Sequence, residues 1–260
     1  MSDLAPSRET PLHDSARVLA HRRAVVGLAT ALAVAGSLTI AVSTGSDMLD
    51  GFDTALTDLT RGWADPAGWP VDVAHVVGLV TAPLWSALAA TVLVLILLLT
   101  HHRAAAGLLA MSGIAGVTVS ETVKMSMGRT RPPGAEEFEQ DLDKSFPSGH
   151  AMVGIYLYLA TGLVLIHLGR SLGLRWMEVV GRVLVIVGPL IGLSRLVLGV
   201  HWPSDIIAGW AFGSAVLLAS ALILWWPLDR GWPTRAEAPT AAATPPALPG
   251  AGTTPAPPAR

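Results

Sequence analysis

The sequence contains no cysteine, which excludes disulfides, thiolate metal sites and a cysteine nucleophile. Charge is also scarce, since 14% of the 260 residues are charged, whereas a soluble domain usually carries about a quarter. The net charge of -2 gives no indication of nucleic-acid binding. By contrast, 52% of the residues are hydrophobic and they gather in long runs, which indicates a membrane protein. Few lysines beside many alanines, valines, glycines and arginines are typical of a GC-rich bacterial genome.

Six apolar stretches are long enough to cross a bilayer, which takes about 20 residues in a helix. They cover residues 24–43, 76–100, 104–123, 149–168, 179–199 and 206–226. The sequence therefore predicts an all-α bundle of six transmembrane helices within one membrane domain, residues 17–235. Pro83 predicts a kink in the second helix. Residues 1–16 and the Pro/Ala-rich residues 236–260 cannot bury a core, so we expect disordered tails there.

The first apolar stretch has a second interpretation, as a cleaved signal peptide. It follows Arg22 and Arg23, and Ala33-Val34-Ala35 resembles a cleavage site. Its apolar run is longer than a typical signal core, which favours a retained membrane helix.

Basic residues in short loops predict the orientation of the bundle, because they concentrate on the cytoplasmic side. In the six-helix arrangement one side holds Arg22, Arg23, Arg103, Arg170, Arg175, Arg182, Arg230 and Arg235. We therefore expect a multi-pass protein of the plasma (inner) membrane with both termini in the cytoplasm. The opposite side has an acidic first loop, but its second loop carries Lys124, Arg129, Arg131 and Lys144 against this trend. These four residues are expected to have another task.

The first outer loop contains a helical pattern of apolar residues. Phe52, Leu56, Leu59 and Trp63 share one face at helical spacing. The pattern predicts a short helix that either lies in the membrane interface or packs on the bundle.

Three segments reach the same outer face in this arrangement, and together they bring Lys124, Arg131 and Arg195 to one membrane depth. An arginine in an apolar helix costs roughly 2.5–3.5 kcal/mol on insertion scales. Three converging cations would repel one another unless an anion lies between them, and a phosphoryl group fits because arginine can bind its oxygens in pairs. Ser148 and Gly149, at the start of a helix, add backbone N–H donors.

Two histidines supply groups that can react. His201 precedes a helix that starts at Pro203, and Asp205 lies four residues on, within reach of one imidazole nitrogen. This pairing would set the tautomer and leave the other nitrogen free to attack. His150 begins another span and can donate a proton to a leaving oxygen.

Taken singly, each of these residues also has a structural interpretation. Asp205 can be a helix N-terminal acid, Ser148 an N-cap, and Arg131 or Lys124 an interfacial anchor. Glu121 lies one turn before Lys124 and can pair with it. Their co-occurrence in three segments on one face favours a shared function.

The three segments resemble the signature of the type-2 phosphatidic acid phosphatase superfamily, which includes lipid phosphate phosphatases and, by shared site, vanadium haloperoxidases. The signature has three parts, and each is present: Lys124 to Arg131-Pro132, Pro147-Ser148-Gly149-His150, and Ser194-Arg195 to His201 and Asp205. The resemblance implies that His201 is the nucleophile, that Asp205 orients it and that His150 is the acid. It further implies phosphate binding by Lys124, Arg131, Ser148, Gly149 and Arg195, with no metal or other cofactor. Arg129 and Lys144 lie outside the signature, and their role stays open between steering an anionic headgroup and no specific task.

The predicted function is hydrolysis of a lipid phosphate or pyrophosphate at the extracytoplasmic face through a phosphohistidine. An outward site in a bacterium favours a polyprenyl pyrophosphate carrier, with phosphatidic acid or phosphatidylglycerol phosphate close behind. Two rival hypotheses are a vanadium haloperoxidase-like oxidoreductase and a non-enzymatic protein that binds or transports lipid phosphates. The expected partners are the lipid substrate and membrane lipids, and the sequence does not indicate the oligomeric state.

Overall fold

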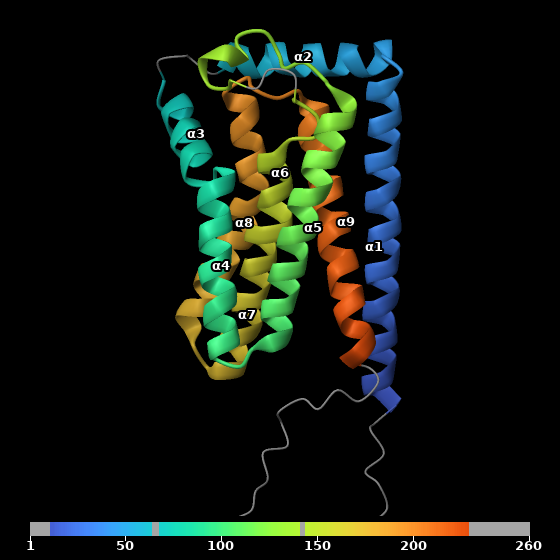
Figure 1. Cartoon of the computed structure of the whole chain (residues 1–260), viewed down its shortest axis with the longest axis vertical. Coiled ribbons are helices and arrows are strands. Elements are labelled where there is room, and N and C mark those ends of the chain that lie inside the picture. Colours follow the sequence, from blue (N-terminus) through green and yellow to red (C-terminus); the bar gives the residue numbers. More distant parts are fainter. Residues whose placement is uncertain (1–10, 64–67, 141–143, 229–260) are drawn as a thin grey trace, which may run out of the picture.

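The computed structural model describes residues 11–63, 68–140 and 144–228, and every regular element within these ranges is a helix. The elements are α1 (Pro11–Ser43), α2 (Asp47–Trp63), α3 (Trp69–Val80), α4 (Pro83–Leu99), α5 (Arg103–Met127), η1 (Ala135–Glu137), α6 (Gly149–Val153), η2 (Gly154–Leu159), α7 (Ala160–Leu172), α8 (Arg175–Val197) and α9 (Pro203–Leu228). Figure 1 shows the long helices side by side in one bundle. In the described part, five helices are long and apolar enough to cross a membrane, and the bent pair α3–α4 makes up to six. The predicted all-α fold with six spans is confirmed.

The predicted spans match these helices with small shifts at the ends. The helix α1 begins at Pro11, inside the segment 1–16 that we expected to be a tail. The fourth predicted span is one continuous stretch, Gly149–Leu172, built from α6, η2 and α7. Its middle section, η2, has π-helical hydrogen bonding, which is rare and widens the helix locally. The predicted tail 236–260 lies outside the described residues.

The second predicted span is broken into two helices. The axes of α3 and α4 differ by 53° across the break, and Pro83 is the first residue of α4. Proline has no N–H and its ring would clash with the preceding turn of a helix, so a kink or a break is favoured at this point. The kink expected at Pro83 is a break between two helices, and α3 lies toward the end of the bundle that α2 crosses (Figure 1).

Small residues let the central helices approach closely. In the pair formed by α7 and α8, a Cβ atom added to Gly162 would lie 2.6 Å from the carbonyl oxygen of Gly181. Backbone contact of this kind is a common way to pack helices in a bilayer, where burial of apolar side chains supplies no drive for association. The stretch Gly149–Leu172 is the most enclosed of the five long candidate spans, and its first turn carries one of the predicted site segments.

The predicted loop helix is α2, which lies across one end of the bundle (Figure 1). Its inward face is polar, because Asp53 and Thr57 are buried while Phe52 and Leu59 are exposed. An exposed apolar face is what an interfacial helix offers to lipid, so the arrangement favours the interfacial interpretation of this helix. The same arrangement brings α2 against the start of α9.

Candidate active site

The three predicted segments meet at the end of the bundle that α2 covers, and hydrogen bonds tie them together. The amide of Ser145 donates to the Arg129 carbonyl over 2.9 Å, which joins the first segment to the second. The amide of Ser148 donates to the Asp205 carbonyl over 3.0 Å, which joins the second to the third. The guanidinium of Arg131 donates to the Val200 carbonyl over 2.7 Å, which joins the first segment to the third. The site is thus built from chain segments that are distant in sequence but share buried backbone partners.

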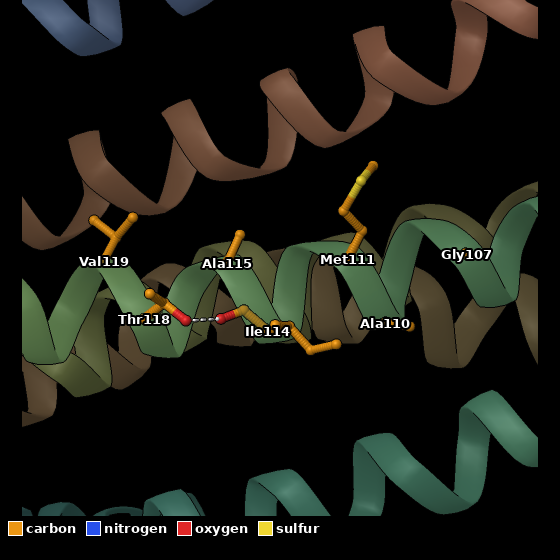
Figure 2. Close-up of a pocket in the computed structure, with 7 residues that line it drawn as sticks. All are labelled: Gly107, Ala110, Met111, Ile114, Ala115, Thr118 and Val119. Carbon is orange, nitrogen blue, oxygen red and sulfur yellow. Dashed lines mark hydrogen bonds between the residues drawn. The ribbon is translucent and has the colours of Figure 1, made fainter.

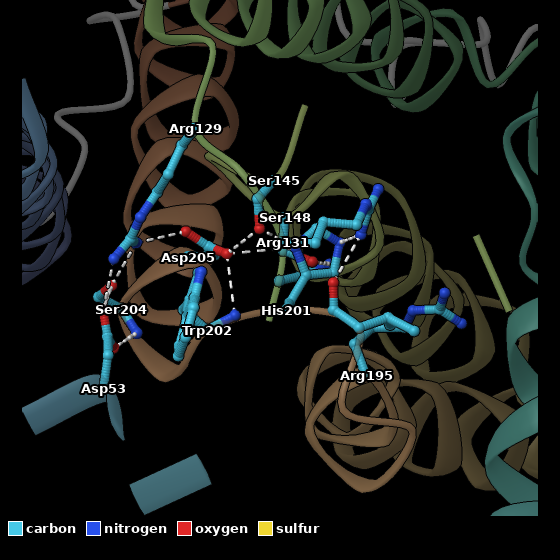
Figure 3. Close-up of polar contacts among 12 residues, drawn as sticks. Asp53, Arg129, Arg131, Ser145, Ser148, Arg195, His201, Trp202, Ser204 and Asp205 are labelled. Atoms are coloured by element: carbon cyan, nitrogen blue, oxygen red, sulfur yellow. Dashed lines mark hydrogen bonds and ion pairs between the residues drawn. The ribbon is translucent and has the colours of Figure 1, made fainter. Parts of the chain in front are cut away.

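The pair His201 and Asp205 lies at the centre of this cluster (Figure 3). Both residues are buried, with 2% and 0% of their surface exposed. The imidazole Nδ1 of His201 lies 3.4 Å from Oδ2 of Asp205, which also accepts the amide of Trp202 over 2.9 Å. The turn that starts α9 at Pro203 therefore holds the carboxylate against the ring, as the four-residue spacing predicted.

The second imidazole nitrogen of His201 points to a cation. Its Nε2 lies 3.0 Å from Nη1 of Arg131, and a guanidinium can only donate. Neutral His201 therefore carries its proton on Nδ1, facing Asp205, and presents the Nε2 lone pair. Burial lowers the pKa of His201 to about 4, against the opposing effect of Asp205 and with a further lowering by Arg131. The imidazole is thus neutral near pH 7, which is the state a nucleophile requires.

Arg131 and Arg195 come together around a carboxylate. Arg195 Nη2 donates to Oε1 of Glu139, and Nη2 of Arg131 lies 3.7 Å from Oε2 of the same side chain. The converging cations required an anion in the sequence argument, and the structure has Glu139 in that place. The Nε of Arg195 is buried and finds no acceptor among the described residues. A buried N–H without an acceptor is costly, and an anionic oxygen bound to it would remove that cost.

Lys124 and the start of α6 form the other wall of the site. A Cβ atom added to Gly149 would lie 3.1 Å from the Lys124 ammonium, so the glycine leaves room for the cation at the helix start. The hydroxyl of Ser148 accepts the Ala151 amide over 3.4 Å and caps the helix. The expected pairing of Lys124 with Glu121 is present at 3.5 Å, on an exposed carboxylate. Ser148 therefore has the structural role of an N-cap. Gly149, at the start of α6, lines the cavity.

His150 follows in the first turn of α6 and contacts α3. Its Nε2 lies 3.2 Å from the carbonyl oxygen of Gly78. The guanidinium of Arg195 lies so close to Gly78 that a Cβ atom there would collide with it. Gly78 was not identified from the sequence, because nothing in an apolar helix marks which glycine meets a distant side chain.

Arg129, Ser145 and Asp53 also belong to the site, although their sequence positions predicted no defined role for any of them. Arg129 donates to Asp205 Oδ1 and to Asp53 Oδ2, each over 2.7 Å. The Ser145 hydroxyl donates to Asp205 Oδ2 over 2.5 Å. Although burial disfavours the charged guanidinium, the carboxylates of Asp205 and Asp53 raise the pKa of Arg129 above its ordinary value. The one available signal was a basic residue on the side of the bundle where few are expected, and among these three residues it marked only Arg129.

An apolar groove leads away from the cations between α4 and α5. It has a volume of about 540 Å³, and its lining runs from Lys124, Gly149 and His150 to side chains deep in the bundle such as Val94 and Leu109. An open depression of about 550 Å³ continues along α5 and shares Ala110, Ile114 and Thr118 with the groove (Figure 2). In the part of the chain that the structure describes, no three His, Asp or Glu side chains form a group that could hold a metal ion. The site therefore combines a cationic end with a long apolar wall.

Comparisons with known proteins agree on one family. Residues 103–229 match the sequence model of the PAP2 superfamily. The chain is 32% identical over 134 residues to an undecaprenyl-diphosphatase from Sulfolobus acidocaldarius, covering 50% of this chain and 60% of the relative. It is 32% identical over 101 residues to a decaprenylphosphoryl-5-phosphoribose phosphatase from Mycobacterium tuberculosis, covering 38% of this chain and 49% of that relative. The matched region thus spans less than two thirds of either curated protein.

A solved structure resembles the fold. It is a transmembrane PAP2-type phosphatidylglycerolphosphate phosphatase from Bacillus subtilis, with a TM-score of 0.62 and 19% sequence identity, covering 80% of this chain and 96% of that one. At this identity the likeness shows the shared helical architecture.

Proposed function

The chain belongs to the PAP2 superfamily, and from this premise we propose that it is an integral membrane phosphatase that hydrolyses a lipid phosphate or diphosphate without a metal cofactor. One observation carries the proposal. The unprotonated Nε2 of His201 lies 3.0 Å from Nη1 of Arg131, and Arg131 lies beside Arg195 around a single carboxylate. A phosphoryl group bound by these two arginines would have its phosphorus next to the nucleophile.

The proposed reaction has two displacements. His201 Nε2 attacks phosphorus, the bond to the lipid or phosphate leaving oxygen breaks, and His150 gives that oxygen a proton. Water then attacks the phosphohistidine, His150 takes a proton from the water, and inorganic phosphate leaves with His201 restored. Asp205 stabilises the positive charge that grows on the imidazole. Lys124, Arg131, Arg195 and the helix start at Ser148-Gly149 hold the charge that spreads over the phosphoryl oxygens.

The apolar groove supports a lipid as the leaving group. It begins at Lys124 and His150 and continues between α4 and α5 along apolar side chains. A chain of methylene or prenyl units in this groove would place its phosphate at the cations. A short phosphate ester would leave this apolar wall uncovered, whereas a lipid chain matches it, which favours lipids as substrates.

Polyprenyl phosphates and diphosphates are the substrate class that we favour. The names of the archaeal and mycobacterial relatives both refer to polyprenyl carriers. The basic residues of the opposite loops support a site on the extracytoplasmic face of the plasma membrane, where polyprenyl diphosphates would be hydrolysed. Phosphatidic acid and phosphatidylglycerol phosphate are the next candidates.

A phosphate-release panel with purified protein in detergent tests this function. We expect release from undecaprenyl diphosphate with the highest kcat/KM, activity that persists in EDTA, and no release by His201→Ala. No release from any lipid phosphate would refute the function and leave a binding or transport protein. Halide peroxidation on addition of vanadate and peroxide would instead favour an oxidoreductase.

A further inference from the structure

Asp53 is a buried carboxylate in a helix that no part of the signature includes. It lies on the inward face of α2, with 1% of its surface exposed. Burying a charged carboxylate costs several kcal/mol unless it is paired and hydrogen-bonded. The hydrogen-bond partners of Asp53 therefore explain how a charged carboxylate can be buried here.

Asp53 binds Ser204, in the first turn of α9, and Arg129, in the loop after α5 (Figure 3). Oδ1 accepts the Ser204 amide over 2.8 Å, and Oδ2 accepts the Ser204 hydroxyl over 2.5 Å. Oδ2 also accepts Nη2 of Arg129 over 2.7 Å. The other terminal nitrogen of Arg129 donates to Asp205 Oδ1 over 2.7 Å, so one guanidinium bridges two buried carboxylates.

This chain of contacts ends at His201. Asp205 is held through Oδ1 by Arg129, while its Oδ2 faces Nδ1 of His201 at 3.4 Å. Asp53 fixes Arg129 from behind and binds the backbone turn that carries Asp205. We propose that Asp53 is a positioning residue, which orients the Asp205–His201 pair through Arg129. This inference rests on the proposed function.

Position 50 offers a matched control on the same helix. The Asp50 carboxylate lies 3.9 Å from Arg129 but is 65% exposed, and exposed ion pairs contribute little. We expect Asp53→Asn to lower kcat roughly tenfold or more, on the scale of other groups that orient a reactive histidine. Asp50→Asn should stay within about twofold of wild type. The inhibition constant of inorganic phosphate should hardly change in either, because Lys124, Arg131 and Arg195 are intact.

A double-mutant cycle separates positioning from general stability. If Asp53 acts through Arg129, the kcat losses of Asp53→Asn and Arg129→Gln should not add in the double variant. Arg129→Lys provides a second route if Asp53→Asn does not fold. A compact ammonium does not reproduce the planar fork whose two terminal nitrogens bind the two carboxylates, so this variant should also lower kcat with phosphate binding retained. A kcat for folded Asp53→Asn within twofold of wild type, or fully additive losses, would overturn the inference. An inactive wild type would instead refute the proposed function.

Glu139 carries a second and independent inference. Its carboxylate lies between Arg131 and Arg195, the two arginines proposed to bind phosphate. With 22% of the Glu139 side chain exposed, against 6% for Arg131 and 4% for Arg195, it is the most accessible member of the group. The Nε of Arg195 finds no acceptor among the described residues while Glu139 holds its other end.

We infer that Glu139 is an internal competitor, which pairs with Arg131 and Arg195 and is displaced from them by the phosphate of the substrate. A singly charged carboxylate keeps the cations from repelling one another but yields to a doubly charged group with more oxygens. A lipid with a singly charged phosphodiester would displace Glu139 less readily, because its charge is no greater than that of the carboxylate. The contact would thus limit their binding to the site.

Binding of inorganic phosphate tests this inference whether or not the protein turns over a lipid. For Glu139→Gln at fixed ionic strength, we expect phosphate to bind at least about fivefold more tightly and to raise the melting temperature by a larger step than in wild type. Glu137→Gln, an exposed change in the same segment, should behave as wild type. Glu139→Asp, whose shorter side chain should compete less, serves if the glutamine variant does not fold. Unchanged or weaker phosphate binding in both Glu139 variants would overturn the inference.

Discussion

The burial of His201 predicts an unusual pH profile for the nucleophilic step. Its pKa is lowered to about 4, whereas an unperturbed histidine has a pKa of about 6.5. Only the neutral imidazole attacks phosphorus. At pH 5 a group with a pKa of about 4 is about 90% neutral, and one with a pKa of about 6.5 is only about 3% neutral, a difference of roughly 30-fold. Because the pKa is lowered, activity should persist on the acid side.

The assay is kcat/KM for nitrophenyl phosphate between pH 4 and pH 8, corrected for the ionisation of the substrate. This constant reports groups of the free enzyme, and the activated ester needs little help from an acid. We expect the corrected value at pH 5 to stay within about twofold of that at pH 7 and to fall only as the pH approaches about 4. His150→Ala, which removes the acid, should leave this profile in place. A corrected kcat/KM that falls with a midpoint near 6.5 would refute the neutral, buried nucleophile.

Three further predictions concern Arg195, His150 and the orientation of the protein in the membrane. Arg195→Lys should lower kcat/KM at least roughly 10²-fold, since an ammonium cannot make paired bonds to phosphate oxygens; near-normal activity would make Arg195 merely structural. His150→Ala should lose roughly 10²-fold or more on a lipid phosphate but much less on nitrophenyl phosphate, whose leaving group needs no proton; equal losses on both would contradict its role as the acid. A single cysteine near Gln140 should react with an impermeant thiol reagent on intact cells while one near His102 should not; the reverse pattern would place the site in the cytoplasm.

The fold was predictable because the hydrocarbon core of a membrane requires long apolar helices. All six predicted spans correspond to helices, with the second divided at Pro83 into α3 and α4. Proline predicted a bend, but the size of the bend depends on what the two halves pack against. The tilt of α3, which brings Gly78 to His150, could therefore not be derived from local sequence.

The site was predictable where spacing along one helix or turn decides the contact. Asp205 meets His201 because four residues at a helix start place them together. Asp53 and Glu139 were missed because their contacts depend on how a loop helix and a turn fold over the bundle. The apolar residues of α2 could be grouped on one face, but the sequence did not indicate that the opposite, polar face contacts the bundle.

Trapping of the phosphorylated protein is the most direct test of His201 as the nucleophile. Purified protein would be mixed with ³²P-labelled substrate and denatured in alkali, because acid cleaves a phosphohistidine. We expect label on the wild type and none on His201→Ala. With the activated ester as substrate, His150→Ala should still be labelled. Label that remains on His201→Ala and disappears from His150→Ala would contradict the assignment of the nucleophile.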